Sequence, residues 1–241
     1  MKQRFWEIDF LRGAAVVMMV IFHFAWYLDF FTGLEISLKS FFWEIFRIIT
    51  VSAFLFLVGI SLYISSHSKD GVFLKFAKRG LYIFSLGLGI TLFTKIFFPD
   101  HYVFFGILHL IGVSIFLAYF FLDFKFINLF FGFAFFALGG LLKALSLDIS
   151  WLYFLGFSSS NISTLDFYPI IPWFGVVLWG IFAAKILYKD RVRQFKLLDL
   201  GDNFLIKKFC FLGRNSLLIY FLHHPVLTLL VYLIQFWLRS G

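Results

Sequence analysis

Seven long apolar stretches constrain the fold of this chain more than any other feature. Each is long enough to cross about 30 Å of hydrocarbon as a helix that rises about 1.5 Å per residue. They lie near residues 9–30, 42–66, 76–98, 102–122, 126–146, 167–187 and 213–237. A mean hydropathy of +0.95 with only 14% charged residues exceeds what the core of a soluble domain requires. The sequence predicts an all-α, polytopic transmembrane helix bundle in the cell membrane, with residues 1–241 as a single integral membrane domain.

Basic residues are distributed unevenly over the connections between these stretches. If the N-terminus is cytoplasmic, most of the 21 Lys and Arg residues fall on the inner side, many of them in the connection at 188–212. Only Lys39, Arg47, Lys95, Lys143 and Arg239 fall towards the outside. The positive-inside rule therefore predicts a cytoplasmic N-terminus and an outer C-terminus, with the first span as an uncleaved anchor. The basic connections suit anionic lipid, and a polyanionic soluble ligand is the alternative.

The first apolar stretch carries ionisable residues at two depths. It contains "IDFLRGAAVVMMVIFHF", in which His23 follows Arg12 by eleven residues. At about 100° per residue the two lie within roughly 20° of one face, about 16 Å apart along the axis. Asp9 is placed to hold the Arg12 guanidinium. One interpretation is a cationic mouth that leads to a titratable imidazole. The other is that Asp9 and Arg12 anchor the helix while His23 hydrogen-bonds a neighbouring helix.

Further polar groups occur at similar depth in other stretches, where ionisable residues are costly and often functional. Arg47 lies in the outer half of the second stretch and requires an acidic partner, a carbonyl or an anionic ligand. "FGILHLIG" places His109 between Gly106 and Gly112, a thin face that another helix or a ligand can approach. Asp166 stands at the outer entrance of the sixth stretch. We expect it to pair with Arg47 or with a histidine.

The last stretch contains "SLLIYFLHHP", in which Ser216, Tyr220 and His223 lie near one face. Adjacent His223 and His224 are expected to point apart on a helix, and no histidine pair at i, i+4 has a nearby carboxylate, so the sequence predicts no metal site. The single cysteine, Cys210, excludes an internal disulfide and a cysteine-based metal site. Nucleic-acid binding has no support beyond the net charge.

Five segments occur in an order that is typical of a known family. They are "IDFLRGAAVVMMVIFHF", "FLFLVGISL", "FGILHLIGVS", "DFYPIIPWFGVVLWGI" and "LGRNSLLIYFLHHPV". Together they resemble the heparan-alpha-glucosaminide N-acetyltransferase catalytic-domain-like family of bacterial and archaeal membrane proteins, over essentially the whole chain. The first segment also resembles the type-three acyltransferases, whose hallmark is an arginine, ten residues and a histidine, here Arg12 and His23. The resemblance implies transfer of an acyl group, in the first instance acetyl, from acyl-CoA to an amine or hydroxyl of a sugar or glycan-type acceptor.

The resemblance and the residue chemistry together define the candidate site. Acyl-CoA is a polyanion on a long flexible arm, which suits cationic contacts at one end and a general base well away from them. The expected catalytic residues are His23 as general base, Asp166, His109 and His223. The expected acyl-CoA-binding residues are Arg12, Asp9, Arg47, Asn215 and Ser216, the last three as donors near the developing oxyanion.

Two other functions fit the same residues. One is a small transporter or channel in which Asp9, His23, His109 and His223 line a polar route. The other is a non-catalytic membrane subunit in which these residues only pair helices. The sequence leaves open the acyl chain, the acceptor, the membrane face of the site and whether the chain forms a homodimer.

Overall fold

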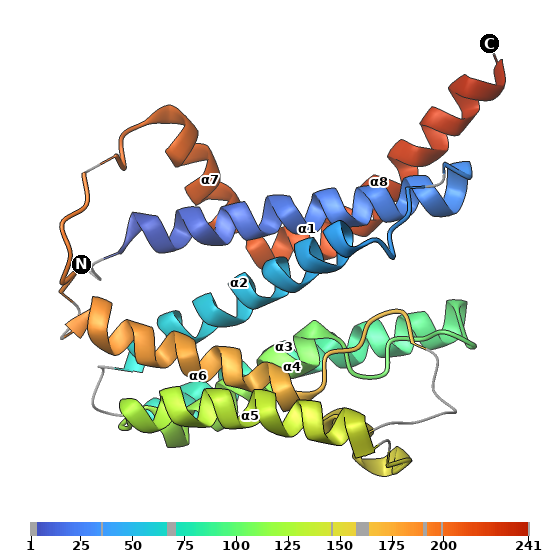
Figure 1. The fold of residues 1–241 in the computed structure, drawn as a ribbon. Coiled ribbons are helices and arrows are strands. Elements are labelled where there is room, and N and C mark those ends of the chain that lie inside the picture. Colours follow the sequence, from blue (N-terminus) through green and yellow to red (C-terminus); the bar gives the residue numbers. More distant parts are fainter. Residues whose placement is uncertain are drawn as a thin grey trace. The chain divides into compact units, whose positions relative to one another are not determined.

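The computed structural model describes residues 4–34, 36–66, 71–145, 147–157, 164–189, 192–198 and 200–240. Within these residues the chain is helical and contains no β-strand, which confirms the all-α prediction (Figure 1). The helices are α1 (Trp6–Thr32), α2 (Phe41–Ser66), α3 (Val72–Phe97), α4 (Ile107–Ala118), η1 (Tyr119–Phe121), α5 (Phe126–Leu145), η2 (Ser150–Leu155), α6 (Ile170–Leu187), α7 (Phe204–Arg214) and α8 (Ser216–Ser240).

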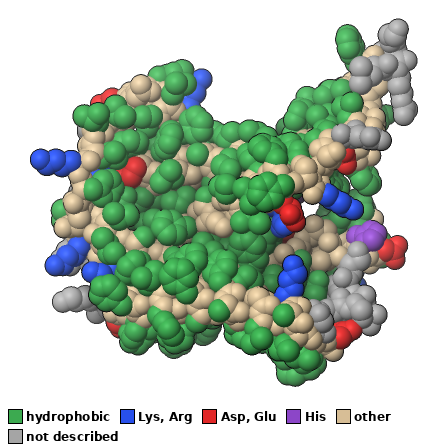
Figure 2. Space-filling model, in the orientation of Figure 1, with side chains coloured by type: hydrophobic (Ala, Val, Ile, Leu, Met, Phe, Trp, Pro, Cys, Tyr) green, Lys and Arg blue, Asp and Glu red, His purple; other side chains and the backbone are tan. Residues whose placement is uncertain are grey.

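Six helices are long and apolar enough to cross a membrane: α1, α2, α3, α5, α6 and α8. A seventh, shorter apolar helix covers Ile107–Phe121, where α4 continues into η1. Their outward side chains are largely apolar, and green hydrophobic side chains cover much of the face seen in Figure 2. This arrangement confirms the prediction of a multi-pass membrane protein of about seven spans.

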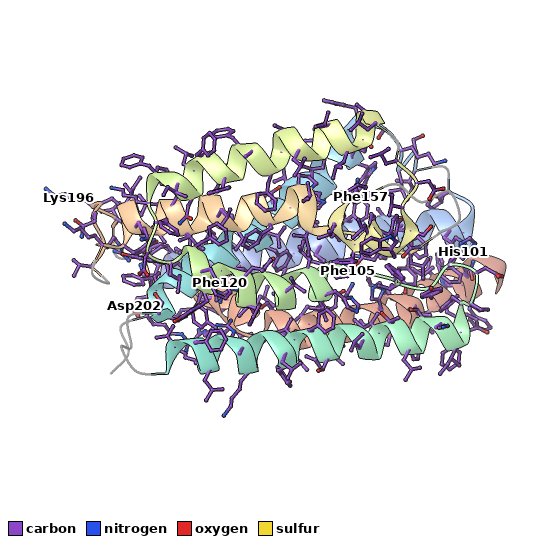
Figure 3. All side chains as sticks on the ribbon, turned by 90° about the horizontal axis from the view of Figure 1, so that it is seen from below. His101, Phe105, Phe120, Phe157, Lys196 and Asp202 are labelled. Carbon is purple, nitrogen blue, oxygen red and sulfur yellow. The ribbon has the colours of Figure 1, made fainter. Side chains whose placement is uncertain are left out.

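The fourth predicted span begins later than its apolar composition indicates. The prediction was 102–122, but α4 begins at Ile107. The preceding residues run beside a segment before α6, because the Leu165 amide donates to the His101 carbonyl (3.1 Å) and the Tyr168 amide to the Phe105 carbonyl (3.0 Å). Figure 3 shows His101 and Phe105 on the approach to α4 and Phe120 beyond its other end. Hydropathy alone does not distinguish such an extended apolar segment from the first turn of a helix.

The connection at 188–212 contains a helix that the hydropathy pattern did not predict. α7 covers Phe204–Arg214, and the Asn203 side chain caps it by accepting the amides of Leu205 (2.9 Å) and Ile206 (3.4 Å). At about 16 Å it is too short to span a bilayer. It buries Cys210 and Gly213 on one side and exposes Lys207 and Lys208 on the other, as in helices that lie at a membrane surface.

Close contacts divide the chain into two compact units, and each is described by itself. The first consists of residues 1–54 and 197–241, with α1, the first part of α2, α7 and α8. The second consists of residues 55–196, with the remainder of α2 and the helices up to α6. The single integral membrane domain stays a prediction.

In the first unit, α1 and α8 lie side by side and run parallel (Figure 1). His23 contacts His223, Tyr27 packs with Leu227 and Val231, and further along the Gln235 side chain donates to the Phe31 carbonyl. In a membrane, two spans run parallel only when an odd number of crossings separates them. The helices α2, α3, α4, α5 and α6 supply an odd number only if the short α4 also crosses, which supports seven spans.

α7 packs closely against the first half of α1. A Cβ atom at Gly13 would overlap the Phe209 carbonyl oxygen, and one at Gly213 would overlap the Asp9 carbonyl oxygen. Only glycine permits this approach of the two backbones. Cys210 lies in the same contact and is buried, which raises the pKa of its thiol.

Glycines make the equivalent approach at helix contacts of the second unit. A Cβ at Gly112 of α4 would lie 2.8 Å from the Gly80 carbonyl oxygen of α3, so the expected close approach at this glycine is confirmed. The pairs are Gly80 with Gly112, Gly132 with Gly175, and Gly59 with Gly180. Lipid gives helices no hydrophobic gain on association, so close packing at small residues stabilises these helix contacts instead.

Candidate functional site

Three histidines of the first unit form one cluster. His23 comes from α1, and His223 and His224 come from α8. The ring centroids lie 4.7 Å apart for His23 and His223, 5.0 Å for His23 and His224, and 4.0 Å for His223 and His224. His223 is 4% exposed, His23 is half-buried and His224 is exposed. Two of the predicted catalytic residues, His23 and His223, therefore lie in contact.

The expectation that His223 and His224 point apart is wrong. The His223 ring turns back along its own helix, with Nδ1 2.7 Å from the Tyr220 carbonyl oxygen. The His224 ring turns towards α1, where its Nδ1 lies 3.1 Å from the Tyr27 hydroxyl. The residues do leave the axis about 100° apart, but they lie on either side of the direction towards α1, so both rings reach His23.

Tyr27 and His224 were missing from the predicted site. Tyr27 lies four residues after His23 and therefore on the same face of α1. Of the two adjacent histidines in α8, only His223 is among the predicted catalytic residues. The signal that could have found both is the combination of a double histidine in one span with a tyrosine and a histidine one turn apart in another.

The hydrogen bond of His23 determines which ring nitrogen can act as a base. Its Nδ1 lies 2.8 Å from the Met19 carbonyl oxygen, four residues earlier in α1. A carbonyl oxygen only accepts, so Nδ1 carries the hydrogen in the neutral ring, and Nε2 holds the lone pair. This hydrogen-bond partner lies in the helix of His23 itself, and not in a neighbouring helix.

Arg12 keeps its predicted relation to His23. Because α1 is one unbroken helix over Trp6–Thr32, Arg12 and His23 stay near one face, about 16 Å apart along the axis. The Arg12 Nη1 lies 3.2 Å from Asp9 Oδ1, which confirms that Asp9 holds the guanidinium. The Nε of exposed Arg4 lies 3.4 Å from the other Asp9 oxygen, so the buried carboxylate joins two cations.

The other predicted residues of the first unit differ in their side-chain contacts. The Asn215 amide donates to the Phe211 carbonyl (2.8 Å) at the end of α7. Among the residues that the structure describes, neither Arg47 nor Ser216 has a side-chain hydrogen bond or ion pair. Arg47 is half-buried on α2, and Ser216 begins α8.

His109 and Asp166, both predicted to be catalytic, meet at the first turn of α4 in the second unit. Asp166 Oδ2 accepts the Ile107 amide (3.0 Å), and His109 Nδ1 accepts the Gly106 amide (3.2 Å). The other nitrogen of His109 then carries the hydrogen, 3.3 Å from the Thr91 hydroxyl. Both side chains therefore satisfy backbone donors of α4 that have no partner within the helix.

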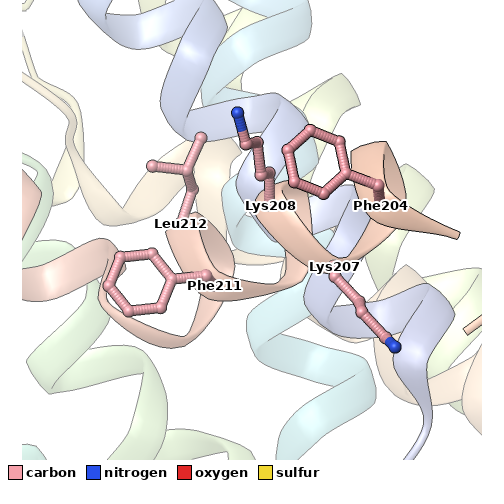
Figure 4. A pocket seen from close by; sticks show the side chains of 5 residues that line it. All are labelled: Phe204, Lys207, Lys208, Phe211 and Leu212. Atoms are coloured by element: carbon pink, nitrogen blue, oxygen red, sulfur yellow. The ribbon is translucent and has the colours of Figure 1, made fainter. Parts of the chain in front are cut away.

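A shallow open depression lies on α7 (Figure 4). It is lined by Phe204, Lys207, Lys208, Phe211 and Leu212. The Lys208 Nζ lies 4.3 Å from the centroid of the Phe204 ring. Lys207 lies 2.8 Å from Asp202, and its hydrogen bond and charge lower the pKa of that exposed carboxyl. The sequence predicts these lysines as topology-determining charges that suit anionic lipid or a polyanionic ligand. The structure adds that α7 combines them with aromatic side chains, as at a lipid headgroup layer.

The fold and the cluster define a class of protein: a multi-pass integral membrane protein with a group of imidazoles on two parallel spans. The sequence model of the family "Heparan-alpha-glucosaminide N-acetyltransferase, catalytic" matches residues 4–225, and the chain belongs to this family. This confirms the resemblance found in the sequence. No curated protein and no solved structure gives a significant match. The family is one of membrane acetyltransferases, which in general terms implies an acetyl-CoA donor.

Proposed function

We propose that the protein transfers an acetyl or other acyl group from acyl-CoA to an amine or hydroxyl of a sugar or glycan-type acceptor. The observation that carries this proposal is the geometry of α1. It presents a cation held by Asp9 and, about 16 Å along one face, an imidazole whose Nδ1 is occupied by the Met19 carbonyl. This separation suits a donor whose phosphates and thioester stand far apart.

The donor end of this arrangement is basic. Asp9 orients the Arg12 guanidinium, which can form charge-assisted, bidentate hydrogen bonds to a phosphate. Lys207 and Lys208 lie on α7, the helix packed against this half of α1. We assign the phosphates of acyl-CoA to Arg12 and these two lysines.

The reaction needs one general base and no change of oxidation state. His23 Nε2 takes the proton of the acceptor N–H or O–H as that atom attacks the thioester carbonyl carbon. The new C–N or C–O bond forms, the C–S bond breaks, and the CoA thiolate leaves and takes the proton from the imidazolium. His223, in contact with His23, helps to orient its ring.

The remaining predicted residues take supporting roles. Arg47 and Ser216 are the candidate donors to the developing oxyanion, because the Asn215 amide already donates to a backbone carbonyl. His109 and Asp166 accept the Gly106 and Ile107 amides at the first turn of α4, and their predicted catalytic role stays a proposal.

The test is acyl transfer by the purified, reconstituted full chain with radiolabelled acetyl-CoA and glucosamine as acceptor, in the presence of EDTA. Acetyl-CoA binding is measured in parallel by calorimetry. His23→Asn is expected to lower the transfer rate by about 10²- to 10⁴-fold with binding unchanged. Arg12→Gln is expected to weaken acetyl-CoA binding instead. His101→Asn, a change at an exposed histidine outside the cluster, serves as the matched control.

Two results would overturn the proposal. One is full transfer activity in a folded His23→Asn protein. The other is no binding of acetyl-CoA or longer acyl-CoAs at millimolar concentration. Proton-coupled flux in liposomes without any transfer would favour the transporter alternative.

A further inference from the structure

The histidine cluster has a second property that acyl transfer does not require. One potential ligand nitrogen from each of His23, His223 and His224 lies within 4.8 Å of the other two. In a tetrahedral zinc site with Zn–N bonds of about 2.0–2.1 Å, ligand nitrogens stand about 3.4 Å apart. Side-chain torsions that bring the rings slightly closer would therefore reach coordination distance.

The Nδ1 atoms of the three rings form hydrogen bonds of the kind that metal-binding histidines form. His23 Nδ1 donates to the Met19 carbonyl and His223 Nδ1 to the Tyr220 carbonyl, at 2.8 and 2.7 Å. His224 Nδ1 is hydrogen-bonded to the Tyr27 hydroxyl. The two carbonyl oxygens can only accept, so they fix the tautomers of His23 and His223 and raise the basicity of the opposite nitrogen. All three rings are thus held by Nδ1, which leaves Nε2 as the ligand atom.

The third observation is the buried Nε2 of His223. It is inaccessible and, among the residues that the structure describes, it has no hydrogen-bond partner. The residue is only 4% exposed. A buried nitrogen lone pair without a partner costs free energy, so a native structure is expected to supply a partner. A metal ion at the centre of the cluster would be that partner.

We infer that Nε2 of His23, His223 and His224 binds a divalent transition-metal ion of the zinc class, with a fourth, open position. Three imidazoles without a carboxylate suit Zn²⁺, Co²⁺, Ni²⁺ or Cu²⁺, whereas Mg²⁺ and Ca²⁺ prefer oxygen ligands. The sequence predicts no metal site because no single helix carries ligands at a suitable spacing. The structure brings the three ligands together from two helices.

Metal binding does not rest on the proposed function, but it bears on it. The ion takes the lone pair of His23 Nε2 that the general base would use. A bound ion therefore excludes proton transfer by His23, and we expect Zn²⁺ to inhibit transfer.

The experiment uses the purified full chain with an affinity tag that contains no histidine, stripped with chelator and exchanged into chelator-free buffer. Zn²⁺ binding is measured by calorimetry and Co²⁺ binding by its visible absorption, both without acyl-CoA. We expect one ion per chain, no binding of Mg²⁺, and a loss of affinity of about 100-fold or more in His223→Ala and in His224→Ala. His101→Ala is the matched control and should bind as the wild type does.

If His223→Ala does not fold, His224→Ala still tests the inference, because His224 is exposed and its replacement should not disturb folding. Tyr27→Phe removes only the hydrogen bond behind His224 and should weaken binding by about 10-fold. Absence of saturable Zn²⁺ binding, or binding unaffected by His224→Ala in a folded protein, would overturn the inference. Because the transfer assay contains EDTA and the binding assay contains no acyl-CoA, either proposal can fail without the other.

Discussion

The imidazole of His23 lies 4.7 Å from that of His223, measured between ring centroids, with the ring planes at 71°. The two residues are 200 positions apart in the chain and belong to helices that run parallel. The contact therefore contributes to the candidate site, and the shared direction of α1 and α8 constrains the topology. If α1 and α8 cross the membrane in the same direction, the connection before α7 lies on the same side as the N-terminus.

The first prediction concerns that topology. In a Cys210→Ala background, which removes the only cysteine, Lys39→Cys should react with a membrane-impermeant maleimide on intact cells. Lys196→Cys should react only after permeabilisation. Both positions are exposed, so accessibility is not limiting. The reverse pattern would contradict the positive-inside assignment, and labelling of both on intact cells would contradict an odd number of crossings between them.

The second prediction concerns the approach of α7 to α1. Gly13→Ala places a Cβ against the Phe209 carbonyl oxygen, so the helices must separate. We expect a loss of about 1–3 kcal/mol in the free energy of unfolding, seen as a lower melting temperature in detergent.

Gly89→Ala on α3 is the matched control for this change, because a Cβ there meets nothing within 4 Å. Its stability should be unchanged or raised, since alanine favours a helix more than glycine does. Equal melting temperatures for Gly13→Ala and wild type would show that the close approach is not needed.

The third prediction separates capping from catalysis at Asp166. Asp166→Ala removes the acceptor for the Ile107 amide and should cost about 1–2 kcal/mol, with faster hydrogen exchange in the first turn of α4. Asp166→Asn keeps an acceptor oxygen and should retain most of the stability and of any transfer activity. A stable but inactive Asp166→Asn protein would instead support the catalytic role that the sequence predicted.

The fourth prediction concerns the reactivity of Cys210. The thiol is buried, lies 3.3 Å from the Trp6 carbonyl oxygen, and has a raised pKa. Since the thiolate is the reactive form, alkylation by iodoacetamide should be at least about 10-fold slower than for a free thiol at pH 8. The rate, followed by mass spectrometry, should rise with pH and reach the free-thiol value in denaturing detergent. Rapid alkylation of the folded protein would show that α7 detaches from α1.

Local patterns account for the parts of the protein that the sequence predicted well. The spans follow from runs of apolar residues, because hydrocarbon requires a helix of a given length wherever such a run occurs. The ion pair of Asp9 and Arg12 follows from their spacing of three on one helix. The start of α4 was misplaced because backbone pairing with a segment more than 60 residues away does not show in hydropathy.

Relations between distant residues were decided only by the tertiary structure. Helical periodicity predicts the direction in which a side chain leaves its own helix, and it correctly separates His223 from His224 by about 100°. It does not predict which helix lies between those two directions. The packing of α8 against α1 brings His23 between them, and the packing of Asp166 onto α4 brings its carboxylate to the Ile107 amide, which it accepts. The sequence by itself determined a membrane bundle with polar residues at defined depths. The tertiary structure determined which of those residues meet, because helix contacts join positions that no local pattern connects.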